Sequence, residues 1–166
     1  MHLPREGAKF CTSKCRVYAH RASKRAPAFP ASMTSRDRWV RRTKAKRPVT
    51  AAGKPASVTD PATWTTFAEA KASPAGAGLG YVLGHGIGCW DLDHCIVDGV
   101  LASWARQFIT AIGFPLMIEV SQSGEGVHVF VTAPEGPGRR IRDGERCIEF
   151  YSAGRYIAVT GNKLTL

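Results

Sequence analysis

The chain has 166 residues with a hydrophobic content of 44%, which suits one domain with a substantial core and is too short for two full domains. No apolar run approaches the roughly 20 residues that cross a bilayer. The basic N-terminus also lacks the apolar stretch of a secretory signal. Five cysteines is an odd number, so we expect reduced thiols in a cytoplasmic protein that does not associate with membranes.

The net charge of +10 is unevenly distributed. Residues 1–54 carry 15 lysines and arginines against two acids, whereas residues 55–166 carry eight against 11. A basic arm on a nearly neutral body indicates contact with phosphates, and a solvated tail without a specific partner is the alternative. Residues 1–32 show no hydrophobic period and are expected to be largely disordered, which leaves residues 33–166 as the folded domain.

The remaining chain alternates expected strands with two helices. Helices are expected around residues 62–71, after Asp60-Pro61, and over residues 99–112, where Trp104 and Phe108 belong to an apolar stripe. A strand begins at Arg38, and further strands are expected over residues 79–83, 87–92, 117–120, 127–132, 147–151 and 156–160. A loop carrying three arginines precedes the last two strands. The pattern predicts an α+β or α/β domain with one mixed sheet.

Asp91 and Asp93 lie at the end of an expected strand, in the run CWDLDHC. Residues i and i+2 of a strand point to the same face, so the two carboxylates should converge. A hard, oxygen-seeking cation such as Mg²⁺ or Mn²⁺ would relieve their repulsion. Taken alone this spacing is weak evidence, because it often occurs by chance at strand ends.

A turn rich in serine and glycine, SQSGEG at residues 121–126, precedes His128. Ser121, Ser123 and Gly124 would offer hydroxyl and backbone N–H groups to an anion, and His128 could reach the same anion. The alternative is an ordinary hairpin turn followed by a surface histidine.

Glu149 lies among apolar residues in the late strand CIEFY. An unpaired acid is costly to bury, so Glu149 should either face water or bind something cationic. Arg155 could contact a phosphate or a sugar, or it could form a structural ion pair with Glu149.

These motifs occur in the order DLDHC, SQSGEGVH and IEFY…GRYIAVTG. Together they resemble the N-terminal bifunctional DNA primase/polymerase domain of phage and plasmid replication proteins, in the archaeo-eukaryotic primase superfamily. The upstream runs KRP (46–48), GK (53–54), ASVTDPATW (56–64) and LGYVL (79–83) are similar to that family as well. The resemblance covers residues 38–162 and departs from the family at Gln122, where a proline is usual.

The resemblance implies an α+β catalytic domain with a mixed, mainly antiparallel, RRM-like sheet flanked by helices. It implies that Asp91, Asp93 and Glu149 bind two Mg²⁺ or Mn²⁺ ions. His128 and Ser123 would contact the nucleotide triphosphate, and Lys46 would face the nucleotide or the template. We expect contacts with the template backbone from six basic residues: Arg41, Arg42, Lys44, Arg139, Arg140 and Arg142.

The expected function is therefore template-directed nucleotidyl transfer with a DNA template and primer and either dNTPs or rNTPs. Family members usually continue into a helical domain and often into a helicase, which this chain would have to receive from a partner. The alternative is a module that binds nucleotides or single-stranded nucleic acid without turnover.

The cysteines provide a weaker candidate metal site. Cys11, Cys15 and His20 could contribute to a zinc site, but no fourth ligand is evident nearby, and His2 and Cys147 are the remaining candidates. We therefore do not expect zinc. Cys89 and Cys95 flank the two aspartates and are interpreted as small core residues.

Overall fold

The computed structural model describes residues 28–144 and 146–166. The elements in chain order are α2 (Ala31–Thr34), β1 (Trp39–Arg42), β2 (Pro48–Val49), η1 (Pro61–Thr63), α3 (Phe67–Ala72), β3 (Gly78–Val82), β4 (Ile87–Asp93), β5 (Ile96–Val97), β6 (Val100–Leu101), α4 (Ser103–Ile112), β7 (Met117–Val120), β8 (Val127–Thr132), β9 (Arg139–Asp143), β10 (Arg146–Tyr151) and β11 (Tyr156–Val159). This combination confirms the predicted α+β class.

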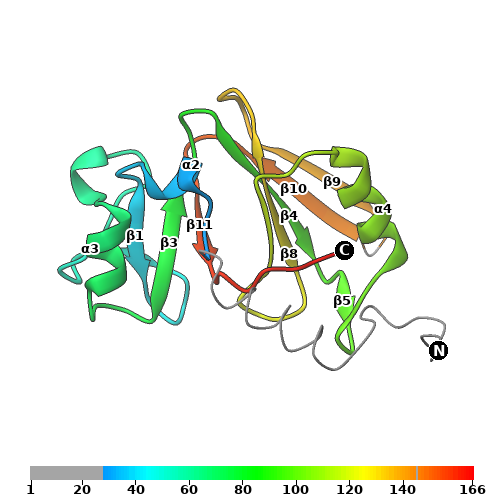
Figure 1. Ribbon diagram of the computed structural model, residues 1–166, viewed down its shortest axis with the longest axis horizontal. Coiled ribbons are helices and arrows are strands. Elements are labelled where there is room, and N and C mark those ends of the chain that lie inside the picture. Colours follow the sequence, from blue (N-terminus) through cyan, green and yellow to red (C-terminus); the bar gives the residue numbers. More distant parts are fainter. Residues whose placement is uncertain (1–27, 145) are drawn as a thin grey trace, which may run out of the picture.

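The strands form two main sheets, where the sequence predicted one. A four-stranded sheet has the order β11-β3-β1-β2, a five-stranded sheet has the order β7-β8-β4-β10-β9, and β5 and β6 form a small hairpin. Every strand pair in the described part of the chain is antiparallel. Figure 1 shows β11, the edge strand of the four-stranded sheet, lying next to the five-stranded sheet.

One hydrophobic core joins the two sheets with α2 and α3. Trp39 is fully buried, and its ring contacts Phe29, Phe67 and Tyr81. Its indole N–H donates to the carbonyl of Met33 at 3.1 Å, so the polar atom of the ring is satisfied. Because Phe29 belongs to this core, the folded domain begins ahead of the predicted boundary at residue 33.

A second core lies on the other face of the five-stranded sheet, beneath α4. Ala105 and Ile109 of α4 pack there against Leu92 and Val129. Trp104 and Phe108 pack against the same cluster, which confirms their interpretation as core residues. Strands β4 and β7 both pair antiparallel with β8 and therefore run in the same direction, with α4 as the connection between them.

Side chains of β4 point alternately to the two faces of the five-stranded sheet. Trp90 and Leu92 face α4, whereas Cys89 belongs to the core shared with the four-stranded sheet. Asp91 and Asp93 lie on the same face as Cys89, because side chains alternate along a strand. The acids thus share one face, as their spacing predicted, and that face is turned toward the four-stranded sheet. Cys89 and Cys95 are both fully buried, which confirms their role in the core.

Three local predictions differ from the structure. The predicted helix over 62–71 is split into η1 and α3, because Thr66 begins α3 with a capping box in which Thr66 and Glu69 exchange hydrogen bonds. The helix predicted from residue 99 begins at Ser103, because Val100 and Leu101 pair with β5. The predicted arginine loop before the last two strands is strand β9, which pairs with β10.

No helix in the described part of the chain is long and apolar enough to cross a membrane.

Candidate active site

A row of five polar side chains crosses the five-stranded sheet from edge to edge. Each is the direct cross-strand partner of the next, so all lie on one face of the sheet. In the order of the strands β7, β8, β4, β10 and β9 they are Glu119, His128, Asp91, Glu149 and Arg140. Three motifs that are far apart in the sequence therefore meet through strand register.

Asp91 lies in the middle of this row and is half-buried. Its Oδ1 lies 3.7 Å from Nε2 of His128. Burial raises the pKa of Asp91, His128 lowers it, and the negative charges of Asp93 and Glu149 raise it further. The net pKa is raised, chiefly because burial disfavours the ionised carboxylate.

Glu149 is 4% exposed and is contacted on both carboxylate oxygens. Arg140 donates to Oε1 and pairs with it. The hydroxyl of Tyr151 donates to Oε2 at 2.8 Å, and Nη2 of Arg155 lies 3.9 Å from the same oxygen. Burial alone would raise the pKa of Glu149, but the hydrogen bonds from Tyr151 and Arg140 and the charges of the two arginines outweigh it and lower the pKa. Glu149 is therefore held as a carboxylate.

His128 is 6% exposed, and each ring nitrogen faces a carboxylate. Nδ1 lies 2.9 Å from Oε1 of Glu119, and Nε2 faces Asp91. Glu119 was missed in the sequence, although its setting in the apolar strand MIEV is the same signal that singled out Glu149.

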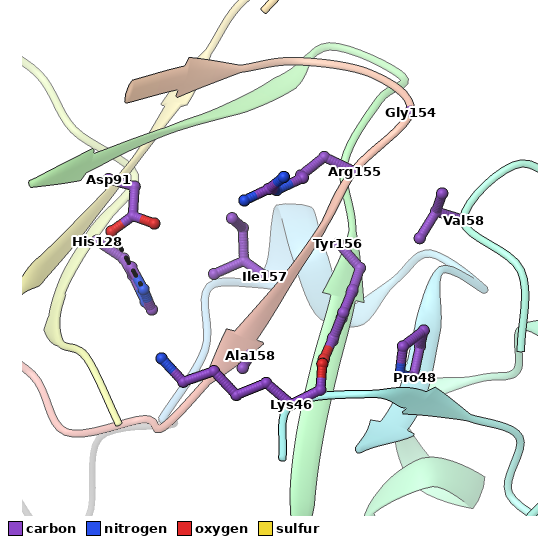
Figure 2. Close-up of a pocket in the computed structure, with 10 residues that line it drawn as sticks. All are labelled: Lys46, Pro48, Val58, Asp91, His128, Gly154, Arg155, Tyr156, Ile157 and Ala158. Carbon is purple, nitrogen blue, oxygen red and sulfur yellow. Dashed lines mark hydrogen bonds and ion pairs between the residues drawn. The ribbon is translucent and has the colours of Figure 1, made fainter. Parts of the chain in front are cut away.

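A cavity of 470 Å³ opens between this row and the four-stranded sheet. Its lining residues are Lys46, Pro48, Val58, Asp91, His128, Gly154, Arg155, Tyr156, Ile157 and Ala158. Figure 2 shows Asp91 and His128 on one side, with the Lys46 side chain extending toward them. Pro48 and Val58 lie at the opposite side, beyond Tyr156. The cavity thus has a charged end and a largely apolar end.

Lys46 reaches this cavity from the loop between β1 and β2. Its backbone is in the left-handed region, with φ of 56°, which few residues other than glycine adopt. The amide of Lys46 donates to Thr43 at 3.1 Å, and the hydroxyl of Tyr156 donates to the Lys46 carbonyl. These contacts hold the backbone of the loop in place, so Lys46 is presented to the cavity from a fixed base.

The serine-glycine turn lies beside the site, but its hydroxyls are engaged within the turn. The Ser121 hydroxyl lies 3.1 Å from that of Ser123 and accepts from the Gly126 amide at 3.2 Å. Ser123 and Gly124 border a different, shallower pocket, together with His94. Of the predicted nucleotide ligands, the cavity brings together Lys46, His128 and Arg155.

The basic residues predicted to follow a template have diverse surroundings. The Arg41 guanidinium donates to the carbonyls of Ala75 and Ala70, at 2.6 and 3.3 Å. Arg42 is 7% exposed and lies over Gly78. Both therefore contribute to the packing of the four-stranded sheet. Lys44, in contrast, is exposed on the loop that follows β1.

The three arginines of β9 do not share a face. Arg140 and Arg142 pair with Glu149 and Cys147 and lie on the face of the acids. Arg139 pairs with Phe150, and its guanidinium lies 5.1 Å from the centre of that ring, on the face toward α4. Alternation along the strand therefore separates Arg139 from the site.

The acids form a donor set that suits a hard divalent cation. Asp93, Cys147 and Glu149 have ligand atoms within 4.8 Å of one another. Asp91 lies directly opposite Glu149, and burial raises its pKa. Carboxylate oxygens suit a hard divalent cation, whereas the Cys147 thiol does not. The zinc candidates Cys11, Cys15, His20 and His2 lie outside the described residues.

Comparison with known proteins gives two matches. Residues 18–165 match the family described as "Bifunctional DNA primase/polymerase, N-terminal". The chain is also 38% identical over 119 residues to a protein of Nitratiruptor phage NrS-1 named "DNA Primase-polymerase". That similarity covers 66% of this chain and 16% of the relative, so the chain spans only a small part of the relative's length.

Proposed function

Because the chain belongs to the family of N-terminal bifunctional DNA primase/polymerase domains, we propose that it catalyses template-directed nucleotidyl transfer during DNA replication. The observation that carries this proposal is that Asp91, Asp93 and Glu149 share one face of the sheet, with Asp91 lining the charged end of the cavity. Nucleotidyl transfer needs a binding site for the nucleotide phosphates next to carboxylates that can bind divalent metal ions.

We assign Asp91, Asp93 and Glu149 as ligands of two Mg²⁺ or Mn²⁺ ions. When bound, such ions lower the pKa of the primer 3′-hydroxyl and balance charge on the departing pyrophosphate. Arg140 contacts Glu149 in the metal-free protein and would have to yield part of that contact.

The polarity of the cavity supports one orientation of the nucleotide. Lys46, His128 and Arg155 supply positive or hydrogen-bonding groups for the triphosphate. Tyr156, Pro48 and Val58 lie toward the other end, where apolar contacts suit a base and its sugar. The turn with Ser121, Ser123 and Gly124 fixes the start of β8 through hydrogen bonds between Ser121 and Gly126.

The template strand is proposed to follow the exposed basic side chains on the face of the acids. Lys44 lies on the loop after β1, and Arg142 lies on β9 beyond Arg140. Such contacts would be sequence-independent and would weaken with salt.

The proposed setting is a phage or mobile-element replication protein that acts in the cytoplasm. A helicase or a helical priming domain would be supplied by a partner or by other parts of a longer protein.

A module that binds without turnover is the second candidate function. The observation that favours it is the engagement of Glu149 by Arg140 and Arg155, which balances the charge of a metal carboxylate without any metal. Such a module would bind nucleotides or single-stranded nucleic acid in the same cavity.

One assay separates these functions. Purified protein is incubated with Mn²⁺, nucleotides and template, with and without an annealed primer, and with dNTPs and rNTPs in separate reactions. Products in the primed reaction alone identify a polymerase, and products in both reactions identify a primase/polymerase. Nucleotide binding without any product under Mg²⁺ or Mn²⁺ would reject the catalytic proposal in favour of the binding module.

A further inference from the structure

Glu119 is a fully buried carboxylate to which the proposed reaction assigns no role. It lies on β7, at one end of the polar row, and is 0% exposed. Burying an ionised carboxylate is costly unless its oxygens accept hydrogen bonds. Among the described residues its ion-pair partner is His128. The groups that donate hydrogen bonds to its two oxygens therefore indicate its role.

One carboxylate oxygen of Glu119 accepts a hydrogen bond from His128. Oε1 lies 2.9 Å from Nδ1, and a carboxylate can only accept, so Nδ1 carries the proton. The bond fixes the proton on Nδ1 and the plane of the ring, and Nε2 can donate to a phosphate when it also carries a proton. Nε2 is then the ring atom left for a ligand, at the cavity wall and 3.7 Å from Oδ1 of Asp91.

The other oxygen binds the segment that follows β11. Oε2 accepts from the amides of Thr160 and Gly161, at 3.1 and 2.8 Å, and the Thr160 hydroxyl, which donates to the Val120 carbonyl at 2.7 Å, lies 3.3 Å from the same oxygen. Strand β11 belongs to the four-stranded sheet and contributes Ile157 and Ala158 to the cavity. Glu119 thus ties a strand of one sheet to the histidine of the other.

We infer that Glu119 is a positioning residue. It holds Nε2 of His128 toward the nucleotide and fixes the distance between the His128 ring and strand β11 in the cavity wall. Its catalytic consequence rests on the proposed function, whereas its effect on the His128 ring does not. In metal sites, replacing the hydrogen-bonded partner of a ligating histidine typically costs about 10–100-fold in metal affinity or activity, and we expect an effect at the lower end of that range here.

The competing interpretation is that Glu119 only anchors the C-terminal segment. The two roles can be tested separately, because Oε1 contacts His128 and Oε2 contacts the segment after β11. Thr160→Val removes the hydroxyl that contacts Oε2 and leaves the Oε1 bond to His128 in place. Glu119→Gln keeps the shape of the side chain but replaces one acceptor with a donor. Thr160→Val is therefore the matched control for the structural half of the contact.

The test combines a nitrogen-15 spectrum of the histidine side chains with nucleotide kinetics. In the wild type and in Thr160→Val we expect the same His128 nitrogen shifts, with a proton on Nδ1, and the same nucleotide KM. In Glu119→Gln we expect altered His128 nitrogen shifts and a nucleotide KM about tenfold higher or more, with a smaller change in kcat. Glu119→Asp, which keeps the charge, should recover part of the loss.

Two results would overturn the inference: unchanged His128 shifts in a folded Glu119→Gln variant, or an equal rise in KM for Thr160→Val. Thermal unfolding identifies variants that have lost the fold, and Glu119→Asp then takes the place of the glutamine variant. If the wild type shows no extension, the proposed function fails, while the histidine spectra still decide the positioning role.

Discussion

Asp91 and Glu149 are direct cross-strand partners on β4 and β10, so two carboxylates face each other on one side of the sheet. Like charges in this relationship destabilise a sheet. The structure offsets the two charges unequally, because Arg140, Arg155 and Tyr151 all contact Glu149, whereas Asp91 faces His128 at 3.7 Å. The pKa of Glu149 is accordingly lowered and that of Asp91 is raised.

Asp91→Asn should stabilise the metal-free protein at neutral pH, because asparagine removes the cost of ionising a carboxyl group that burial disfavours. The folded state holds the Asp91 proton more tightly than the unfolded state, so the free energy of unfolding falls as pH rises from 3.8 through the raised pKa. Asparagine does not titrate, so its advantage should grow over that window and then stay constant. Thermal unfolding with a chelator, from below pH 3.8 to neutrality, measures this difference.

Asp143→Asn is the matched control, because the Asp143 side chain is 77% exposed and, among the described residues, its ion-pair partner is Arg146 of β10. It should change the melting temperature little. Equal melting temperatures for wild type and Asp91→Asn at every pH would show that Asp91 carries no electrostatic strain.

Arg140→Gln should destabilise the metal-free protein and strengthen metal binding. Glu149 would lose its hydrogen-bonded cation, yet the carboxylate would become more available to a metal. We expect a lower melting temperature in chelator, a larger increase on adding Mn²⁺, and a lower Mn²⁺ dissociation constant by calorimetry. A weaker affinity for Mn²⁺ would mean that Arg140 helps to build the metal site.

Lys46→Met should weaken triphosphate binding about tenfold or more, because a charge-assisted hydrogen bond contributes about 1.5–3 kcal/mol. Methionine leaves the left-handed backbone at this position as strained as lysine does. The affinity for a nucleoside monophosphate should fall less, since Lys46 reaches the charged end of the cavity. Competition binding with both nucleotides measures the two effects, and an equal loss for both would contradict a contact with the distal phosphates.

Gly80→Ala should lower nucleotide affinity through Tyr156. A Cβ at Gly80 would lie 2.6 Å from the Tyr156 ring, which lines the cavity. The ring must move, and its hydroxyl then loses the Lys46 carbonyl. Gly136→Ala is the control, because nothing lies within 4 Å of its added methyl group. Fluorescence titration with a labelled nucleotide should show a loss for Gly80→Ala alone.

The sequence was most informative where the signal is local. The spacing of Asp91 and Asp93 predicted a shared face, and the apolar runs around them placed β4, β7 and β8 correctly. It could not show that His128 and Glu149 are the neighbours of Asp91 on either side, because register is set by pairing between distant strands. The family resemblance supplied that grouping in advance.

The failures have physical causes as well. Strand β9 carries exposed side chains along its whole length, so no apolar alternation marked it, and its pairing with β10 alone makes it a strand. The same pairing brings Arg140 to Glu149 and turns Arg139 to the opposite face. The division into two sheets depends on long-range pairing, such as β11 with β3, that no local pattern reveals.

The most direct test of the central claim is the rate of primer extension in Mn²⁺ by the wild type and by Asp91→Asn, with Asp143→Asn as control. Metal-based charge stabilisation contributes several kcal/mol to such a reaction, so the account predicts a loss of about 100-fold or more for Asp91→Asn. Asp143→Asn should extend at the rate of the wild type. Extension by a folded Asp91→Asn variant at the wild-type rate would contradict the account.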